Sequence, residues 1–322
     1  MSILSSPAQV GGSSAKANVR RAITGGRTDV AGTAFMVLML VALLMSVVIL
    51  AVLVIDMVSR GQTVLTERLG DFLTGSMSSQ PGASGIIQGL RGTFWIGVFT
   101  VVIAFPLGIA SAIYLEEYAP HHSKVARFID VNIRNLAGVP SVVYGILGLT
   151  LFVKAMGGVL GPQSNGRSVI AAGLTLAILV LPIVIITSAE ALRAVPSGIR
   201  EAGFGVGATR WEVTRHHVLP YAAPGILTGT VLALARSLGE AAPLILVGAT
   251  TGYLSGGADF LNLGALTDRF TALPIIITTW AGRPGEDWEA VTAAAIIVLL
   301  VVVLVANTAA ILLRNKFDKL RS

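Results

Sequence analysis

Six stretches of this chain are apolar over lengths that can cross a lipid bilayer, and no other feature constrains the fold as strongly. A transmembrane helix needs about 20 predominantly apolar residues, so each stretch predicts one span. The stretches cover residues 33–55, 93–115, 136–153, 168–189, 222–249 and 290–313. The sequence therefore predicts an all-α polytopic membrane protein with six transmembrane helices.

Composition agrees with this fold class and excludes several functions. The chain is 54% hydrophobic and 12% charged, which lies outside the range of soluble globular proteins. It contains no cysteine, so it forms no disulfide and holds no iron–sulfur cluster, haem thiolate or cysteine-ligated zinc. The net charge of +6 comes largely from basic residues in short loops, which indicates membrane orientation and not nucleic-acid binding.

The distribution of basic residues predicts the orientation. Fifteen of the 23 Lys and Arg residues lie in the first 30 residues, in segments 116–135 and 190–220, or after residue 313. Seven lie on the opposite side, and Arg236 lies within a span. By the positive-inside rule, both termini and the loops after spans two and four are cytoplasmic. Residues 1–30, rich in Ser, Gly and Ala, are expected to form a disordered cytoplasmic tail.

Arg236 and Glu240 lie one helical turn apart inside the fifth apolar stretch. An ionised side chain near the membrane centre costs roughly 3 kcal/mol, so such residues commonly line a transport path. Mutual neutralisation of the two charges is the structural alternative. Pro243 frees the carbonyl of Gly239 from its helical hydrogen bond and predicts a kink over residues 236–243. We therefore expect an anion path at this kink.

The cytoplasmic loop over residues 190–220 has the pattern of two short amphipathic helices. Ser197 is expected to cap the first helix, which ends near Val206 where glycines permit a turn. Thr209 and Glu212 form a capping-box pattern for the second helix, and Pro220 is expected to end it. Either the charged outer faces are simply solvated, or the turn docks a cytoplasmic partner.

The same loop carries a family signature. Glu201, Ala202 and Gly203, followed by Gly207 and the pair Leu219–Pro220, resemble the EAA motif of bacterial ABC-importer permeases. The motif usually has alanine where this chain has Gly203, which should weaken the helix slightly. The resemblance implies that the loop inserts into a groove of an ATP-hydrolysing subunit and couples its motion to the membrane helices.

Three further runs narrow the resemblance. AGVPSVVYGILGL at 137–149, the run over 219–248 and FTALPIIITTW at 270–280 are similar to the permeases of phosphate-specific ABC transporters. GEAAPL at 239–244 in particular resembles the PstA-type subunit and not its PstC-type partner. The resemblance implies a type I importer fold, with a permease core over residues 86–317 that includes the coupling loop 190–220. The resemblance extends from about Gly89 to Phe317. Outside it, hydropathy and charge predict a first span and external loop over residues 31–85 and a cytoplasmic tail over residues 318–322.

The resemblance also implies function and partners. The chain would be a non-catalytic permease subunit of an ATP-driven inorganic phosphate importer in the bacterial inner membrane. It would pair with a PstC-type permease, a PstB-type ATPase dimer and a PstS-type phosphate-binding protein. Arg236 and Glu240 would line the substrate pathway, and Glu201, Ala202, Gly203 and Gly207 would couple to the ATPase.

Alternative functions remain open from the residues alone. A self-sufficient, ion-coupled anion carrier or channel would also use a midplane arginine and glutamate, but it has no need of an ATPase-docking loop. An intramembrane enzyme would need a nucleophile with a base, or a metal cluster, inside the bilayer. The sequence has no P-loop pattern, so ATP hydrolysis is expected in a partner, with no cofactor or metal bound by this chain.

Overall fold

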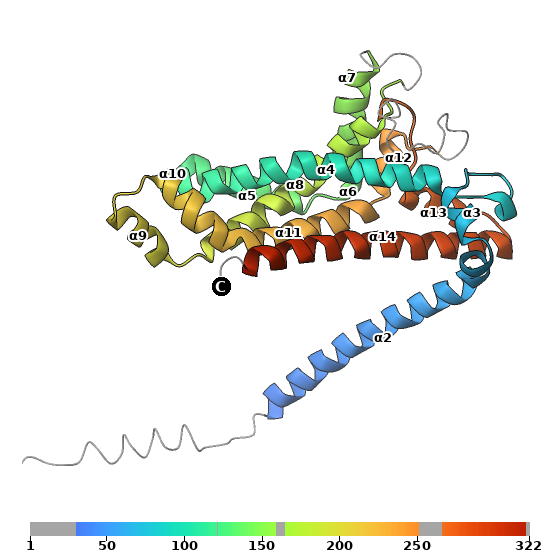
Figure 1. Cartoon of the computed structure of the whole chain (residues 1–322), viewed down its shortest axis with the longest axis horizontal. Helices are drawn as coiled ribbons and strands as arrows, with labels where there is room; N and C mark the ends of the chain where they lie inside the picture. Colours follow the sequence, from blue (N-terminus) through green and yellow to red (C-terminus); the bar gives the residue numbers. More distant parts are fainter. Residues whose placement is uncertain (1–29, 121, 159–164, 251–265, 320–322) are drawn as a thin grey trace, which may run out of the picture. The chain divides into compact units, whose positions relative to one another are not determined.

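The computed structural model describes residues 30–120, 122–158, 165–250 and 266–319, and every regular element within them is a helix (Figure 1). The predicted tail before Val30 and the last three residues lie outside these ranges. The chain divides into two compact units, residues 1–55 and 56–322. Each unit is described separately.

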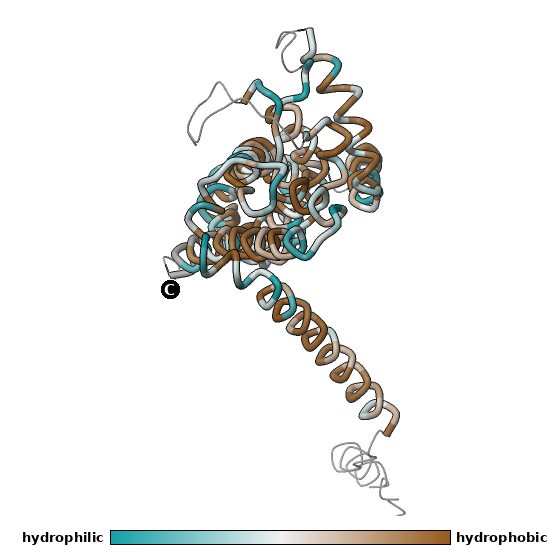
Figure 2. Tube along the Cα trace, turned by 90° about the vertical axis from the view of Figure 1, so that its right-hand side faces the viewer, coloured by the Kyte–Doolittle hydropathy of each residue, from teal (hydrophilic) through white to brown (hydrophobic). Residues whose placement is uncertain are grey.

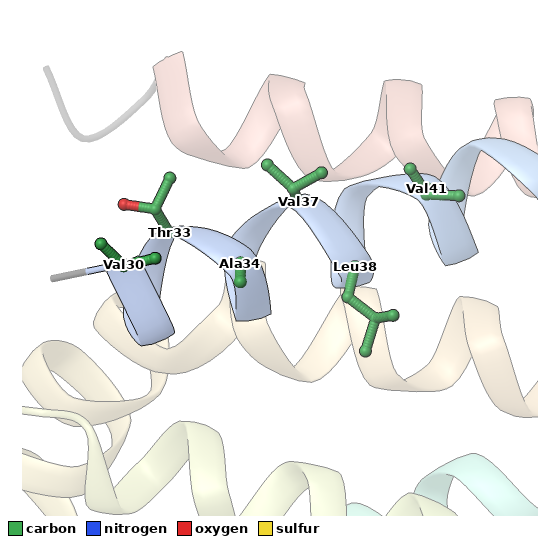
Figure 3. Close-up of a pocket in the computed structure, with 6 residues that line it drawn as sticks. All are labelled: Val30, Thr33, Ala34, Val37, Leu38 and Val41. Atoms are coloured by element: carbon green, nitrogen blue, oxygen red, sulfur yellow. The ribbon is translucent and has the colours of Figure 1, made fainter.

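The described part of the first unit is the beginning of α2 (Val30–Glu67). Its side chains from Val30 to Leu53 are all exposed, and this stretch is predominantly apolar (Figure 2). Six residues at helical spacing line a shallow hollow along its N-terminal half: Val30, Thr33, Ala34, Val37, Leu38 and Val41 (Figure 3). A helix with this composition and length fits the predicted first span.

The second unit is built around four long helices that run side by side (Figure 1). They are α4 (Ile87–Ile113), α8 (Val169–Arg193), α11 (Leu219–Gly239) and α14 (Glu286–Lys319). Helix α8 packs against both α4 and α11, and 67% of its most apolar segment is buried. Helix α14 covers α11 from the other side, and only 11% of its most apolar segment is buried.

Five helices in the described part of the chain are long and apolar enough to cross a membrane, and a bent pair gives a sixth if it is counted as one span. The fold class predicted from the sequence, an all-α polytopic membrane protein, is therefore confirmed. The bent pair replaces the predicted third span, and it differs from a straight helix.

The third span does not begin at Leu136 as predicted. Helix α5 (Lys124–Ala137) ends there, and α6 (Ser141–Gly148) starts after Pro140 and continues through a π-helical turn, η3 (Leu149–Val153). The axes of the two parts differ by 102°. Pro140 disfavours the helical conformation at the residue before it, and here the helix ends at Ala137 and resumes at Ser141 in a new direction. The hydroxyl of Tyr144 donates to the carbonyl of Leu136 at 2.8 Å and fastens the bend.

The segment between the first and second spans is folded, not an irregular loop. Helix α3 (Leu69–Thr74) and a 3₁₀ turn, η1 (Pro81–Ala83), pack near α13 (Leu273–Ala281) and the start of α14. Phe72, Trp280 and Trp288 form the aromatic centre of this cluster. The sequence predicts α13 as an interfacial or re-entrant helix; it is too short to span, but its Trp280 is buried within the protein.

Candidate functional site

The predicted kink in the fifth span is a complete break in the helix. Helix α11 ends at Gly239, Glu240 has extended backbone angles (φ −81°, ψ 121°), and α12 (Ala242–Val247) then begins. The break therefore falls at Glu240 and Ala241, before Pro243 and not at it. Pro243 instead occupies the first turn of α12, where a missing N–H costs no hydrogen bond.

The two charged residues face each other across the end of α11. Nε of Arg236 lies 3.6 Å from Oε1 of Glu240, inside ion-pair range but beyond a good hydrogen bond. The Arg236 side chain is 54% exposed, and the Glu240 side chain is 19% exposed. Neither side chain makes a hydrogen bond to any other described residue. The pair is thus loosely joined, and the guanidinium keeps free donors.

Arg236 lies on an exposed stripe of α11 together with Thr228, Leu232 and Gly239. These residues follow each other at intervals of three or four, so they share one helix face. Burying this face against lipid would leave the guanidinium charge unsolvated, at a cost of several kcal/mol. The face therefore suits a polar path or a second protein subunit.

Helix α12 holds the far side of the break in place. A Cβ atom at Gly145 of α6 would lie 2.7 Å from Cα of Pro243 and 2.8 Å from Cδ1 of Leu246, so the two helices are in direct backbone contact. The run GVPSVVYG, which contains Gly145, therefore packs against the run that contains Glu240. These two runs, which are distant in sequence, are therefore in contact in the fold.

The loop 190–220 contains the two predicted helices, α9 (Ser197–Gly205) and α10 (Arg210–Val213). The capping box is confirmed, because Thr209 and Glu212 exchange hydrogen bonds between side chain and backbone. Gly207 has a φ of +84°, a value that glycine adopts without strain, and it makes the turn between the helices. The predicted cap by Ser197 is wrong: Pro196 takes the capping position and no side chain bonds there.

Pro220 does not end the second helix as predicted. A π-helical turn, η4 (Thr214–Val218), follows α10 and leads directly into α11, so Arg210–Gly239 forms one continuous 30-residue helix. Pro220 lies in the first turn of α11, just after the wider π-helical turn. In a regular helix a proline lacks the N–H that would bond the carbonyl four residues earlier, and its ring crowds that carbonyl. The wider π-helical turn before Pro220 relieves this crowding.

The predicted coupling residues take different places on this loop. Glu201 and Ala202 are exposed, and Glu201 makes no hydrogen bond or ion pair within the described part of the chain. Gly203 is buried and lies close to α10. A Cβ atom added at Gly203 would lie only 2.7 Å from Cγ2 of Val213 in α10. The glycine that departs from the usual alanine therefore lets α9 pack closely on α10.

Sequence reasoning did not identify three exposed apolar residues of the loop 190–220. Phe204, Val206 and Trp211 are 47%, 85% and 54% exposed. Exposed large apolar residues beside an unpaired glutamate are typical of a docking surface. Their grouping in a short polar loop is the sequence signal that could have identified them. Trp211 and Arg236 lie 25 residues apart on the continuous helix Arg210–Gly239, a separation of about 38 Å at 1.5 Å per residue.

The fold and these two sites define a polytopic membrane protein of the transporter class. Residues 104–319 match the family described as "Binding-protein-dependent transport system inner membrane component". The chain therefore belongs to this family, which comprises the permease subunits of ABC importers.

Individual relatives agree with this family. The chain is 32% identical over 272 residues to the phosphate transport system permease protein PstA of Mycobacterium leprae, a match that covers 83% of this chain and 81% of that protein. It is 35% identical over 205 residues to the probable ABC transporter permease protein YqgH of Bacillus subtilis. That match covers 62% of this chain and 65% of YqgH, a little less than two thirds of the relative.

A solved structure agrees at the level of the fold. The inward-facing MetNI methionine ABC transporter has a chain that superimposes with a TM-score of 0.53 and 20% sequence identity. The superposition covers 72% of this chain and 94% of that chain. The predicted type I importer architecture is therefore the fold of the second unit's helical core.

Proposed function

We propose that this chain is the transmembrane permease subunit of an ATP-driven inorganic phosphate importer and forms half of the translocation pathway. The observation that carries the proposal is the half-exposed guanidinium of Arg236 beside a broken helix inside a membrane span. The relatives named as phosphate transport permeases support phosphate as the substrate.

The chemistry of the Arg236–Glu240 pair suits a multiply charged oxyanion. Inorganic phosphate, like a phosphate monoester, carries between one and two negative charges near neutral pH, and a guanidinium offers it several donors in a fixed plane. A transported ion must bind well enough to enter and weakly enough to leave. Glu240, 3.6 Å from the arginine, lowers the net positive charge and so limits how tightly the anion is held.

The loop surface supports coupling to a cytoplasmic ATPase. Glu201 has no ion-pair partner among the described residues, and Phe204, Val206 and Trp211 are exposed, so this end of the chain is suited to a protein partner. The partners implied by the family are a PstC-type permease, a PstB-type ATPase dimer and a PstS-type binding protein. The chain itself would bind no ATP and no other cofactor, and it would lie in the bacterial inner membrane with both termini cytoplasmic.

Reconstitution tests this proposal. The chain is incorporated into proteoliposomes together with a PstC-type permease, a PstB-type ATPase and a PstS-type binding protein, and uptake of labelled phosphate is followed. We expect uptake only when ATP is on the ATPase side and the binding protein is on the opposite side. Phosphate uptake driven by an ion gradient without ATP would instead support the carrier alternative.

A further inference from the structure

A largely buried ion pair joins the coupling loop to a helix that is distant in sequence. Nη2 of Arg200, in α9, lies 2.6 Å from Oε1 of Glu117, and Nε lies 3.2 and 3.3 Å from the two carboxylate oxygens. Glu117 belongs to the π-helical turn η2 (Tyr114–Tyr118), which continues α4 at its cytoplasmic end. The two residues are 83 positions apart in the chain.

The same guanidinium also holds the end of α8. Nη1 donates to the carbonyl of Val195 at 2.8 Å, and Nη2 donates to the carbonyl of Leu192 at 2.9 Å. Arg200 therefore joins three segments: the coupling helix α9, the C-terminal end of α8 and the end of α4. All three nitrogens of the planar guanidinium donate, and Nη2 serves both Glu117 and Leu192, a donor set that a lysine could not reproduce.

This arrangement differs from an ordinary surface ion pair. The Glu117 side chain is 8% exposed and that of Arg200 is 24% exposed. Solvent screens such a pair much less than an exposed one, and the loss of either partner leaves a charge buried without compensation. The neighbouring pair Arg193–Glu116, at 2.5 Å, reinforces the link between α8 and η2.

Helices α4 and α8, which the Arg200–Glu117 pair contacts at one end, are packed tightly against each other. Their mutual packing is the most extensive between any two helices in the described chain. A Cβ at Gly108 of α4 would lie 2.6 Å from Cγ1 of Val184 in α8, so the helices touch without intervening space. A displacement of α9 that is passed to Glu117 is therefore passed to both helices.

We propose that Arg200 and Glu117 are positioning residues that transmit the movement of α9 to the α4–α8 pair. The chain joins α9 to α8 through residues 194–196 and to α11 through α10. The pair adds a direct side-chain connection from α9 to η2, and so to the end of α4. With this connection the end of α4 follows α9 directly; without it, the movement reaches α4 through its contacts with α8, α10 and α11.

This inference rests on the proposed coupling to an ATPase. The test therefore distinguishes a failure of that coupling from a failure of the role assigned to the Arg200–Glu117 pair. In the reconstituted complex, Glu117→Gln and Arg200→Lys should leave the ATPase bound and hydrolysing, while phosphate transported per ATP falls about tenfold, the size expected for loss of a coupling contact. Glu289→Gln, which breaks the exposed Arg60–Glu289 pair at the opposite end of the bundle, serves as the control and should change nothing. Normal transport per ATP in both test variants would overturn the inference. Loss of ATPase binding in both would assign the pair to docking and overturn it equally.

A distance measurement tests the pair without phosphate or ATPase. The chain has no cysteine, so spin labels can be placed at Tyr114→Cys, which is exposed on η2, and at Gly198→Cys, where a side chain meets no atom within 4 Å. We expect a narrow distance distribution in the otherwise unchanged chain and a clearly broader one after Glu117→Gln. Equal distributions would show that the pair does not hold α9, even if the importer proposal stands. If the ATPase fails to co-purify with the unchanged chain, the importer proposal fails, and this measurement still decides whether the pair holds α9.

Discussion

Arg236 and Glu240 are separated by one helical turn in sequence, but the helix ends between them, so their side chains meet at 3.6 Å across a break and not along a helix face. Glu240 has extended backbone angles, and the Arg236 side chain is 54% exposed. A fully neutralised pair inside a helix would have fewer free donors. At this break the guanidinium keeps donors that no described residue takes up.

Arg236→Gln should abolish phosphate uptake by the reconstituted complex and leave its assembly intact. Glutamine keeps most of the side-chain volume but removes the cation, so phosphate meets a higher barrier at this position. The measurement is labelled-phosphate uptake together with co-purification of the partner subunits. Arg269→Gln, at an exposed position outside the broken helix, is the matched control. Uptake by the Arg236 variant near the unchanged rate would remove this residue from the path.

Glu240→Gln should lower the maximal rate of uptake. It should also lower the half-saturating phosphate concentration, at which uptake reaches half of that maximal rate. Without the carboxylate, the arginine holds the anion more tightly, and release becomes slower. Uptake measured over a range of phosphate concentrations separates the two effects. A higher half-saturating concentration would contradict the assigned role, because it would mean that Glu240 helps to bind phosphate.

Particular residues show how far sequence reasoning extends. The spans, the capping box at Thr209 and the proximity of Arg236 to Glu240 are local patterns, so they are readable from the chain. The bend at Pro140 was missed because hydropathy records apolar length and not direction. The helix through Pro220 was missed because a π-helical turn has no distinctive composition. The Arg200–Glu117 pair joins residues 83 positions apart, and only the tertiary fold brings them together.

Glu201→Lys should detach the ATPase and leave the chain folded. The residue is exposed and makes no side-chain hydrogen bond or ion pair within the described ranges, so the substitution reverses a charge on the proposed docking surface with little effect on the fold. Co-purification of the ATPase, with the thermal transition of the chain measured in parallel, checks both parts. Arg215→Glu, a charge reversal at another exposed position of the same segment, is the control for a general change of charge. Retained ATPase with normal stimulated hydrolysis would count against docking through Glu201.

Gly203→Ala should destabilise the coupling loop, even though alanine is the usual residue of the family's motif and the better helix former. The new methyl group would lie 2.7 Å from Cγ2 of Val213, and overpacking of this kind typically costs about 1–3 kcal/mol. We expect weaker binding of the ATPase and faster proteolysis within residues 197–213. The second substitution Val213→Ala removes the clashing methyl groups and should restore both properties in the double variant. If Gly203→Ala instead behaves like the unchanged chain, then α9 can shift away from α10 at little cost, and the close packing at Gly203 does not fix the position of the docking surface.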